Sequence, residues 1–142
     1  MKLESQVCSL ELAKELKELG VKQESFFRHM SGTIMCRYEQ RQYPTAWDSG
    51  ISAFTVAELG ELLPKQIEYK TNDYGDRAGY RNLDLKIGKT IINDGWYVMY
   101  SDPHPSNKVP VYAQHADTEA DARAKCLIHL IKNDLYTPLN KN

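Results

Sequence analysis

The longest amphipathic pattern lies near the C-terminus of the chain. Thr118 is an N-cap candidate, and the apolar residues after it recur at the three-and-four spacing of one helix face. This pattern predicts a helix from Asp117 to Lys132, with Asn133 as a left-handed stop and Pro138 preventing continuation. We expect it to form the spine of the core through Ala120, Ala124, Leu127, Ile128 and Ile131, with Cys126 and Leu130 widening the stripe.

Two shorter helical patterns precede it. One is amphipathic over Ser9–Leu19 and is followed by Gly20, which favours the left-handed conformation that ends a helix. The other begins where Thr55 and Glu58 have the spacing of a capping box, in which side chain and backbone satisfy each other's hydrogen bonds. Pro64 ends this second helix.

Alternating apolar and polar residues predict several strands. The two hairpin candidates are Ser25–Met30 with Thr33–Tyr38 around Ser31-Gly32, and Thr90–Ile92 with Trp96–Tyr100 around Asn93–Gly95. Leu83, Leu85 and Ile87 alternate with polar residues in a further strand. Val109–Tyr112 is short and contains a proline, which favours an edge strand or an extended lead-in to the last helix.

These elements predict one α+β domain over residues 1–142. We expect an antiparallel sheet of about five strands, with the N-terminal, short central and C-terminal helices packed on it. Gln40–Ser52 carries Pro, Gly and Asp and is expected to be irregular.

Composition narrows the classes of function. The net charge is −1, and no basic stripe of the kind that nucleic-acid-binding proteins carry is visible. No apolar run approaches the roughly 18 residues of a membrane helix, and the N-terminus does not resemble a signal peptide, so a cytoplasmic location is expected. The cysteines at 8, 36 and 126 form no zinc pattern and are expected to be buried thiols.

Catalytic motifs are absent from the sequence, and neither a cofactor nor a metal is predicted. Asp102 and His104 are close enough in sequence for an acid–base pair, and His115 lies two residues before Asp117. The aspartates at 73, 76 and 84 do not have the spacing of a calcium loop, which favours a solvated turn. His129 is expected at the edge of the core.

Aromatic residues are the unusual bulk feature, with nine tyrosines and two tryptophans. Such residues are frequent at interfaces, but they also favour strands. Trp47 belongs either to a loop that packs its own aromatics on the core or to a loop that contacts a ligand. The candidate binding residues are Arg41, Tyr43, Trp47, Tyr74, Arg77, Tyr80 and His104.

Three stretches, at residues 9–21, 52–64 and 116–125, resemble small uncharacterised proteins encoded in phages and prophages of gut bacteria. The resemblance covers the helices and implies a phage-related origin in the cytoplasm of a bacterial host. The matching residues are caps and core positions, so the resemblance brings no catalytic residue.

The sequence favours a non-enzymatic binding protein that inhibits a host protein or sequesters a small ligand. A homo-oligomer is compatible with this interpretation. The alternative is a small hydrolase or nucleotide-acting enzyme that uses Asp102, His104 or His115. Nucleic-acid binding would require the arginines at 37, 41, 77 and 81 on one face, and the balanced charge disfavours it.

Overall fold

The structure is a computed structural model that describes residues 2–38, 44–70, 80–103 and 112–137. Its helices are η1 (Leu3–Ser5), α1 (Leu10–Glu18), α2 (Pro44–Ser49), α3 (Val56–Leu62) and α4 (Glu119–Lys132). Its strands are β1 (Phe27–Met30), β2 (Thr33–Cys36), β3 (Ile51–Ser52), β4 (Gln66–Lys70), β5 (Tyr80–Lys89), β6 (Trp96–Ser101) and β7 (Tyr112–Ala116). The predicted α+β class is confirmed, but the strands form two antiparallel sheets instead of one.

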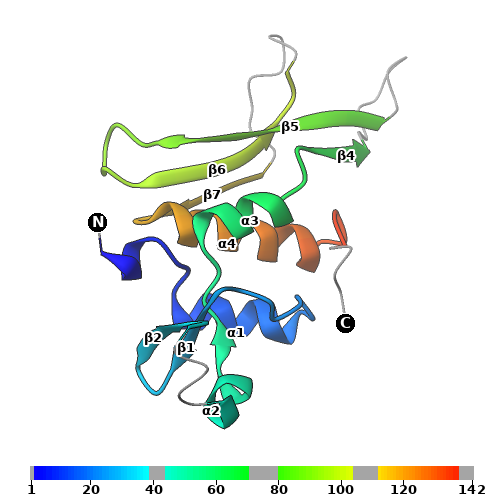
Figure 1. Ribbon diagram of the computed structural model, residues 1–142. Coiled ribbons are helices and arrows are strands. Elements are labelled where there is room, and N and C mark those ends of the chain that lie inside the picture. Colours follow the sequence, from blue (N-terminus) through cyan, green and yellow to red (C-terminus); the bar gives the residue numbers. More distant parts are fainter. Residues whose placement is uncertain (1, 39–43, 71–79, 104–111, 138–142) are drawn as a thin grey trace.

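Helix α4 lies in the middle of the molecule, below the larger sheet in the view of Figure 1. It packs on β6 and β7, and it also contacts α3 and α1. Because neighbours surround it, residues on most sides of the helix are buried, including Ala122, which lies outside the predicted stripe. The prediction that this helix is the spine of the core is confirmed.

The two ends of α4 differ in how well the sequence predicts them. The Thr118 side chain accepts a hydrogen bond from the Asp121 amide, so the predicted N-cap is confirmed. The predicted left-handed stop at Asn133 is wrong, because Asn133 has φ −99° and Asp134 has φ 54°. The chain turns one residue later, at Asp134. As a result, the Leu135 amide donates to the Leu130 carbonyl and the Leu135 side chain packs on the core.

Helix α1 confirms the predicted N-terminal helix and its stop. Gly20 has φ 84°, and the amide of the buried Val21 donates to the carbonyl of Leu16. This is the pairing of a Schellman motif, which satisfies carbonyls at the end of the helix.

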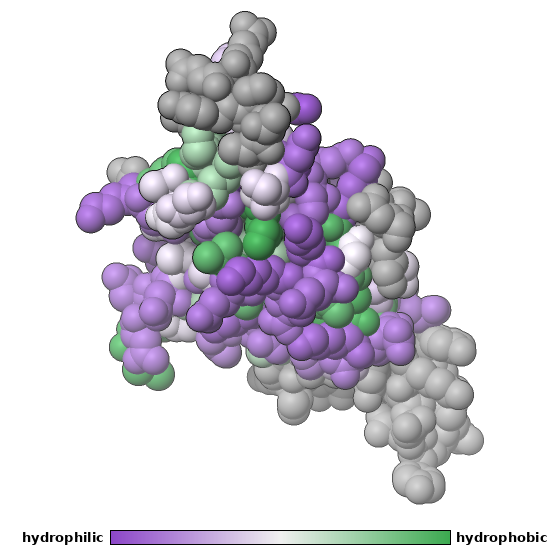
Figure 2. Space-filling view, turned by 90° about the horizontal axis from the view of Figure 1, so that it is seen from below, coloured by the Kyte–Doolittle hydropathy of each residue, from purple (hydrophilic) through white to green (hydrophobic). Residues whose placement is uncertain are grey.

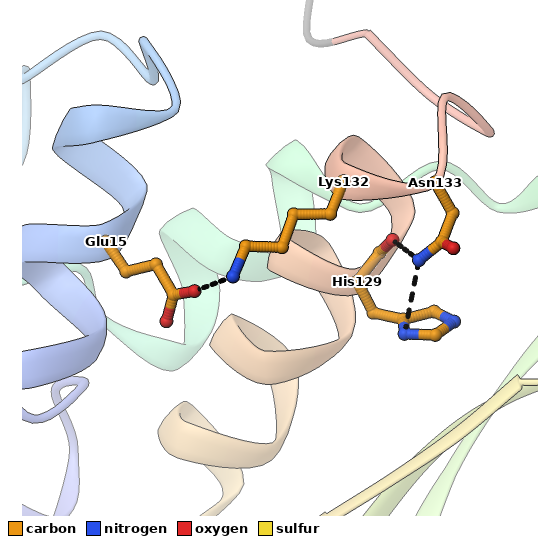
Figure 3. A network of polar contacts seen from close by, with 4 residues as sticks. All are labelled: Glu15, His129, Lys132 and Asn133. Carbon is orange, nitrogen blue, oxygen red and sulfur yellow. Dashed lines mark hydrogen bonds and ion pairs between the residues drawn. The ribbon is translucent and has the colours of Figure 1, made fainter.

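Figure 3 shows polar contacts at the C-terminal end of α4. The Lys132 ammonium forms an ion pair with the Glu15 carboxylate of α1, so this contact joins the two helices. The Asn133 side-chain amide donates to the backbone carbonyl of His129, 2.8 Å away. The Lys132 side chain is 53% exposed, and exposed ion pairs add little stability, so we assign the joining of the helices mainly to apolar packing.

The smaller sheet has the strand order β2-β1-β3. Its hairpin is confirmed: Ser31 and Gly32 both have positive φ, 46° and 82°, as a two-residue turn requires. The prediction that Gln40–Ser52 is irregular is wrong for the described residues 44–52, which form α2 and β3. Ile51 of β3 pairs with His29 of β1, so pairing with a distant strand orders this stretch.

The larger sheet has the strand order β4-β5-β6-β7. Leu83 of β5 pairs with Ile67 of β4, and both side chains are buried in the core. The burial of Leu83 agrees with its alternating pattern. The hydroxyl of the buried Tyr100 donates to the carbonyl of Pro64, 2.5 Å away, which gives its polar end a partner. Strand β7 begins at Tyr112 and is an edge strand, while residues 109–111 lie outside the described part of the chain.

The predicted strand at Thr90–Ile92 is wrong. Strand β5 ends at Lys89, and the Thr90 amide closes the connection by donating to the Gly95 carbonyl, 2.8 Å away. The register of β5 against β6 explains why the strand ends early. Lys89 is the last paired residue and lies opposite Trp96, so the two isoleucines fall in the connection although their residue type favours strands.

The N-terminus of α3 carries the predicted capping box between Thr55 and Glu58. The Glu58 carboxylate also reaches the segment that leads into β1. It accepts hydrogen bonds from the Thr55 amide (2.8 Å), the Ser25 hydroxyl (2.8 Å) and the Phe26 amide (2.9 Å). One side chain therefore joins α3 to the smaller sheet.

We expect Glu58→Ala to lower the free energy of unfolding by about 2–3 kcal/mol, because it removes a charged acceptor shared by four donors, the three above and the Thr55 hydroxyl. Urea unfolding followed by circular dichroism measures this change. The control is Glu61→Ala, at an exposed position of the same helix, with an expected effect within about 0.5 kcal/mol. Equal losses in the two variants would contradict the assigned role of Glu58.

Candidate functional site

A groove of about 830 Å³ lies between the N-terminal segment and the β1–β2 hairpin, and we call it the N-terminal groove. Residues 49–51 close its third side. Its apolar lining includes Leu3, Val7, Leu10, Met30, Ile34 and Ile51. A concave site of this size, in which these apolar side chains lie beside polar ones such as Glu4, His29 and Thr33, has the character of a binding site.

The base of the N-terminal groove is fixed to the start of α3. The Cys8 amide donates to the Phe54 carbonyl, 2.9 Å away, and the Val56 amide donates to the Gln6 carbonyl, 3.1 Å away. These bonds hold the N-terminal segment in an extended form, with the side chains of Val7 and Cys8 buried beneath the groove. The base therefore consists of rigid, hydrogen-bonded backbone.

His29 links the β1 wall to this base. Its ring nitrogen Nε2 lies 2.9 Å from the Cys8 carbonyl oxygen and must carry a proton, because a carbonyl only accepts. The bond fixes the orientation of the ring in the groove and gives His29 a structural role. An acid–base role at this nitrogen would require the bond to break.

The third wall depends on Arg28 and Gly50. The Arg28 guanidinium donates to the carbonyls of Trp47 (2.8 Å), Gly50 (3.2 Å) and Gln23 (2.9 Å), and it lies 5.1 Å from the centre of the Trp47 ring. A Cβ atom on Gly50 would lie 3.0 Å from Cγ of Met30, so glycine permits this close approach. Arg28 thereby fastens residues 47–50 against β1.

The buried thiols are poor nucleophiles. Burial raises the pKa of Cys8 to about 12, and burial likewise raises that of Cys126 to about 12. Both groups are therefore neutral near pH 7, and the thiolate is the reactive form. The prediction of buried thiols is confirmed for these two residues, whereas Cys36 is half-buried and is not shielded to the same extent.

Most of the predicted binding residues lie outside the described part of the chain: Arg41, Tyr43, Tyr74, Arg77 and His104. The backbone of Tyr80 begins β5, but its side chain is not described. Trp47 is 5% exposed and lies against Arg28. Its burial supports the interpretation of Trp47 as a packing residue.

Of the residues considered for catalysis, His104 lies outside the described part of the chain, and neither Asp102 nor His115 lines the N-terminal groove. His115 is exposed on β7 and lines a separate hollow of about 340 Å³ with Asp117 and Asp121. In that hollow, Asp121 accepts from the Ser9 amide (2.7 Å), and the Lys125 ammonium donates to the His115 carbonyl (3.1 Å). Both polar contacts are structural in character.

Two further predictions concern single side chains. Asp84 accepts a hydrogen bond from the side-chain amide of Gln66 on the neighbouring strand, 2.7 Å away, so this carboxylate belongs to the sheet surface. His129 is half-buried beside the Tyr112 ring, with the ring centres 5.2 Å apart, which confirms its predicted place at the edge of the core.

Metal-binding and membrane-spanning features are missing from the described ranges. No group of three or more His, Cys, Asp or Glu side chains there is placed to hold a metal ion. None of the helices in those ranges is long and apolar enough to cross a bilayer. Seen from below, the molecule carries mostly hydrophilic residues, and hydrophobic residues reach that face in small patches (Figure 2).

The chain matches no known protein-family model, no curated protein and no solved structure. The groove therefore has to be interpreted from its own geometry.

The sequence patterns do not predict the N-terminal groove. Its walls come from segments distant in the chain, with Leu3 and Ile51 lying 48 positions apart, and each wall residue also fits an ordinary strand or helix pattern. The available signal was Leu10, which follows the helix N-cap and is 38% exposed in the fold. A leucine there lies outside the buried face of α1.

The raised pKa values predict a loss of stability in alkaline solution. Above about pH 9, the ordinary pKa of the thiol, Cys8 and Cys126 ionise in the unfolded chain while they stay protonated in the folded one. Each thiol should then lower the free energy of unfolding by up to about 1.4 kcal/mol per pH unit until its folded pKa is reached. Urea unfolding between pH 7.5 and 10.5 measures the slope.

Cys8→Ala isolates the contribution of one thiol. Its free energy of unfolding should fall less steeply with pH than that of the wild type, because the unfolded variant has one fewer group to ionise. Identical slopes for the two proteins would show that Cys8 titrates alike in both states, which would contradict the assignment.

Proposed function

We propose that the protein is a non-enzymatic binding protein that holds an apolar segment of a partner protein in the N-terminal groove. The observation that carries the proposal is the groove itself, about 830 Å³ in volume, with apolar walls on a hydrogen-bonded base. Leu10 is 38% exposed beside it, and Met30 and Ile34 are half-buried in the hairpin wall. Covering these side chains would remove apolar surface from water, which favours binding.

The polar groups of the groove indicate which kind of segment would bind there. Glu4 is an exposed carboxylate at the N-terminal rim, and Ser31 and Thr33 are exposed in the hairpin wall. A partner segment with neighbouring apolar residues and a flanking cation fits this combination. A protein segment is favoured over a small ligand, because the groove is bounded by separate chain segments and lies open to solvent along its polar rim.

A phage-related origin and a cytoplasmic setting in a bacterial host are part of the proposal and rest on the sequence resemblance. In that setting, an apolar groove suits an inhibitor that captures a segment of a host protein. The proposal assigns no catalytic residue.

Selection from a random peptide library displayed on phage tests the proposal, with the full chain as bait. We expect enrichment of peptides that carry two or more adjacent apolar residues. The double substitution Leu10→Glu/Ile34→Glu, which we call the groove variant, should weaken the binding of a selected peptide by about tenfold or more. It places two charges against the apolar side chains of the groove. Fluorescence polarisation with the labelled peptide measures the change.

The matched control is Tyr38→Glu, which also replaces an exposed apolar side chain near β2 but lies outside the groove lining. This variant should bind the selected peptide as the wild type does. Circular dichroism should show that all variants are folded. Equal binding to the groove variant and to the wild type would refute the proposal.

A further inference from the structure

The connection between β5 and β6 exposes two large apolar side chains. Ile91 is 102% exposed and Ile92 is 91% exposed, more than any other large hydrophobic residue in the described ranges. We call residues 89–94 the isoleucine tip. The hairpin carries this tip outward from the body of the molecule, at the left in Figure 1. Neither side chain contributes to the core of its own chain.

The isoleucine tip is held in a defined form. The Thr90 amide donates to the Gly95 carbonyl (2.8 Å), and the Gly95 amide donates to the Thr90 hydroxyl (3.2 Å). The Lys89 ammonium lies 5.4 Å from the centre of the Trp96 ring across the base of the tip. These contacts fix the base of the tip, so the base needs little further ordering when Ile91 and Ile92 bind a partner.

The N-terminal groove is complementary to the isoleucine tip. The tip presents two adjacent apolar side chains beside the exposed cation Lys89, and the groove presents apolar walls beside the exposed carboxylate Glu4. These are the features that a partner segment for the groove needs. Complementary charges of this kind fix the register of an interface and disfavour other partners.

The arrangement in Figure 1 places the isoleucine tip and η1, which borders the groove, toward the same side of the molecule. A two-fold axis through that side exchanges the two elements between two copies, so that each copy gives a tip and receives one. Such an isologous arrangement closes on itself and ends at a dimer.

We propose that two copies of the chain form a reciprocal dimer, in which Ile91 and Ile92 of each copy occupy the N-terminal groove of the other and Lys89 faces Glu4. The inference rests on the proposed function, because it names a second copy as an occupant of the same groove. An external partner would then compete with the dimer for the groove.

Sedimentation velocity of the full chain over a range of concentrations tests the inference. The wild type should change from monomer to dimer as concentration rises. The double substitution Ile91→Asp/Ile92→Asp, which we call the tip variant, should weaken the association at least tenfold. The control Tyr38→Asp alters an exposed apolar side chain elsewhere and should leave the association unchanged. A monomeric wild type at the millimolar concentrations of NMR samples would overturn the inference, as would full dimerisation of the tip variant.

Mixing experiments separate pairing of tip with groove from pairing of tip with tip. The tip variant and Leu10→Glu/Ile34→Glu should each remain monomeric alone, but their mixture should associate because one intact contact remains. Lys89→Glu should weaken the dimer, and the addition of Glu4→Lys should restore it. No association in the mixture together with no charge rescue would overturn the pairing of tip with groove.

The peptide selected for the groove distinguishes this inference from the proposed function. The tip variant retains the groove, so it should bind that peptide at least as tightly as the wild type. If it binds the peptide while the wild type never dimerises, the proposed function stands and the dimer is refuted. If the wild type dimerises through the tip and no peptide binds, the dimer stands and the external partner is refuted.

Discussion

The junction between α3 and the smaller sheet depends on the Glu58 carboxylate, because it completes the cap of α3 and also receives hydrogen bonds from the segment entering β1. The smaller sheet packs against α1 through β3 and against α2 through β1, and the Glu58 contacts fasten the segment entering it to α3. The N-terminal segment is fastened to the same place through the Phe54 carbonyl and the Val56 amide. Three parts of the chain thus meet at one helix terminus, where unpaired backbone groups need partners.

Helix α4 buries the apolar surfaces of the elements that lie on its opposite sides. The larger sheet needs a cover for one face, and α1 needs a surface for its apolar stripe. Small residues at Ala120, Ala122 and Ala124 permit close packing in the first half of the helix, and larger side chains such as Leu127 and Leu130 fill the core in the second. The Glu58 contacts at the start of α3 and the packing of α4 together hold two sheets that share no strand pairing within the described residues.

The N-terminal groove follows from this arrangement. Its base is the N-terminal segment fixed to α3, and its walls belong to the smaller sheet fixed by Glu58 and Arg28. Rigid elements on all sides give a site that is formed before anything binds, which lowers the entropic cost of binding. The proposed roles in partner capture and in dimer formation both use this preformed surface, and neither requires a reactive side chain.

Local rules let the sequence by itself determine the α+β class, the three main helices, the capping box, the Ser31-Gly32 turn and most strands. Periodicity and capping act within a few residues, so they can be read along the chain. Only the tertiary structure decided that the strands form two sheets, that β3 pairs with β1, and that Thr90–Ile92 leave the sheet. It also decided the groove, which joins Leu3 to Ile34 and Ile51, because contacts between distant segments depend on three-dimensional register that no short-range pattern encodes.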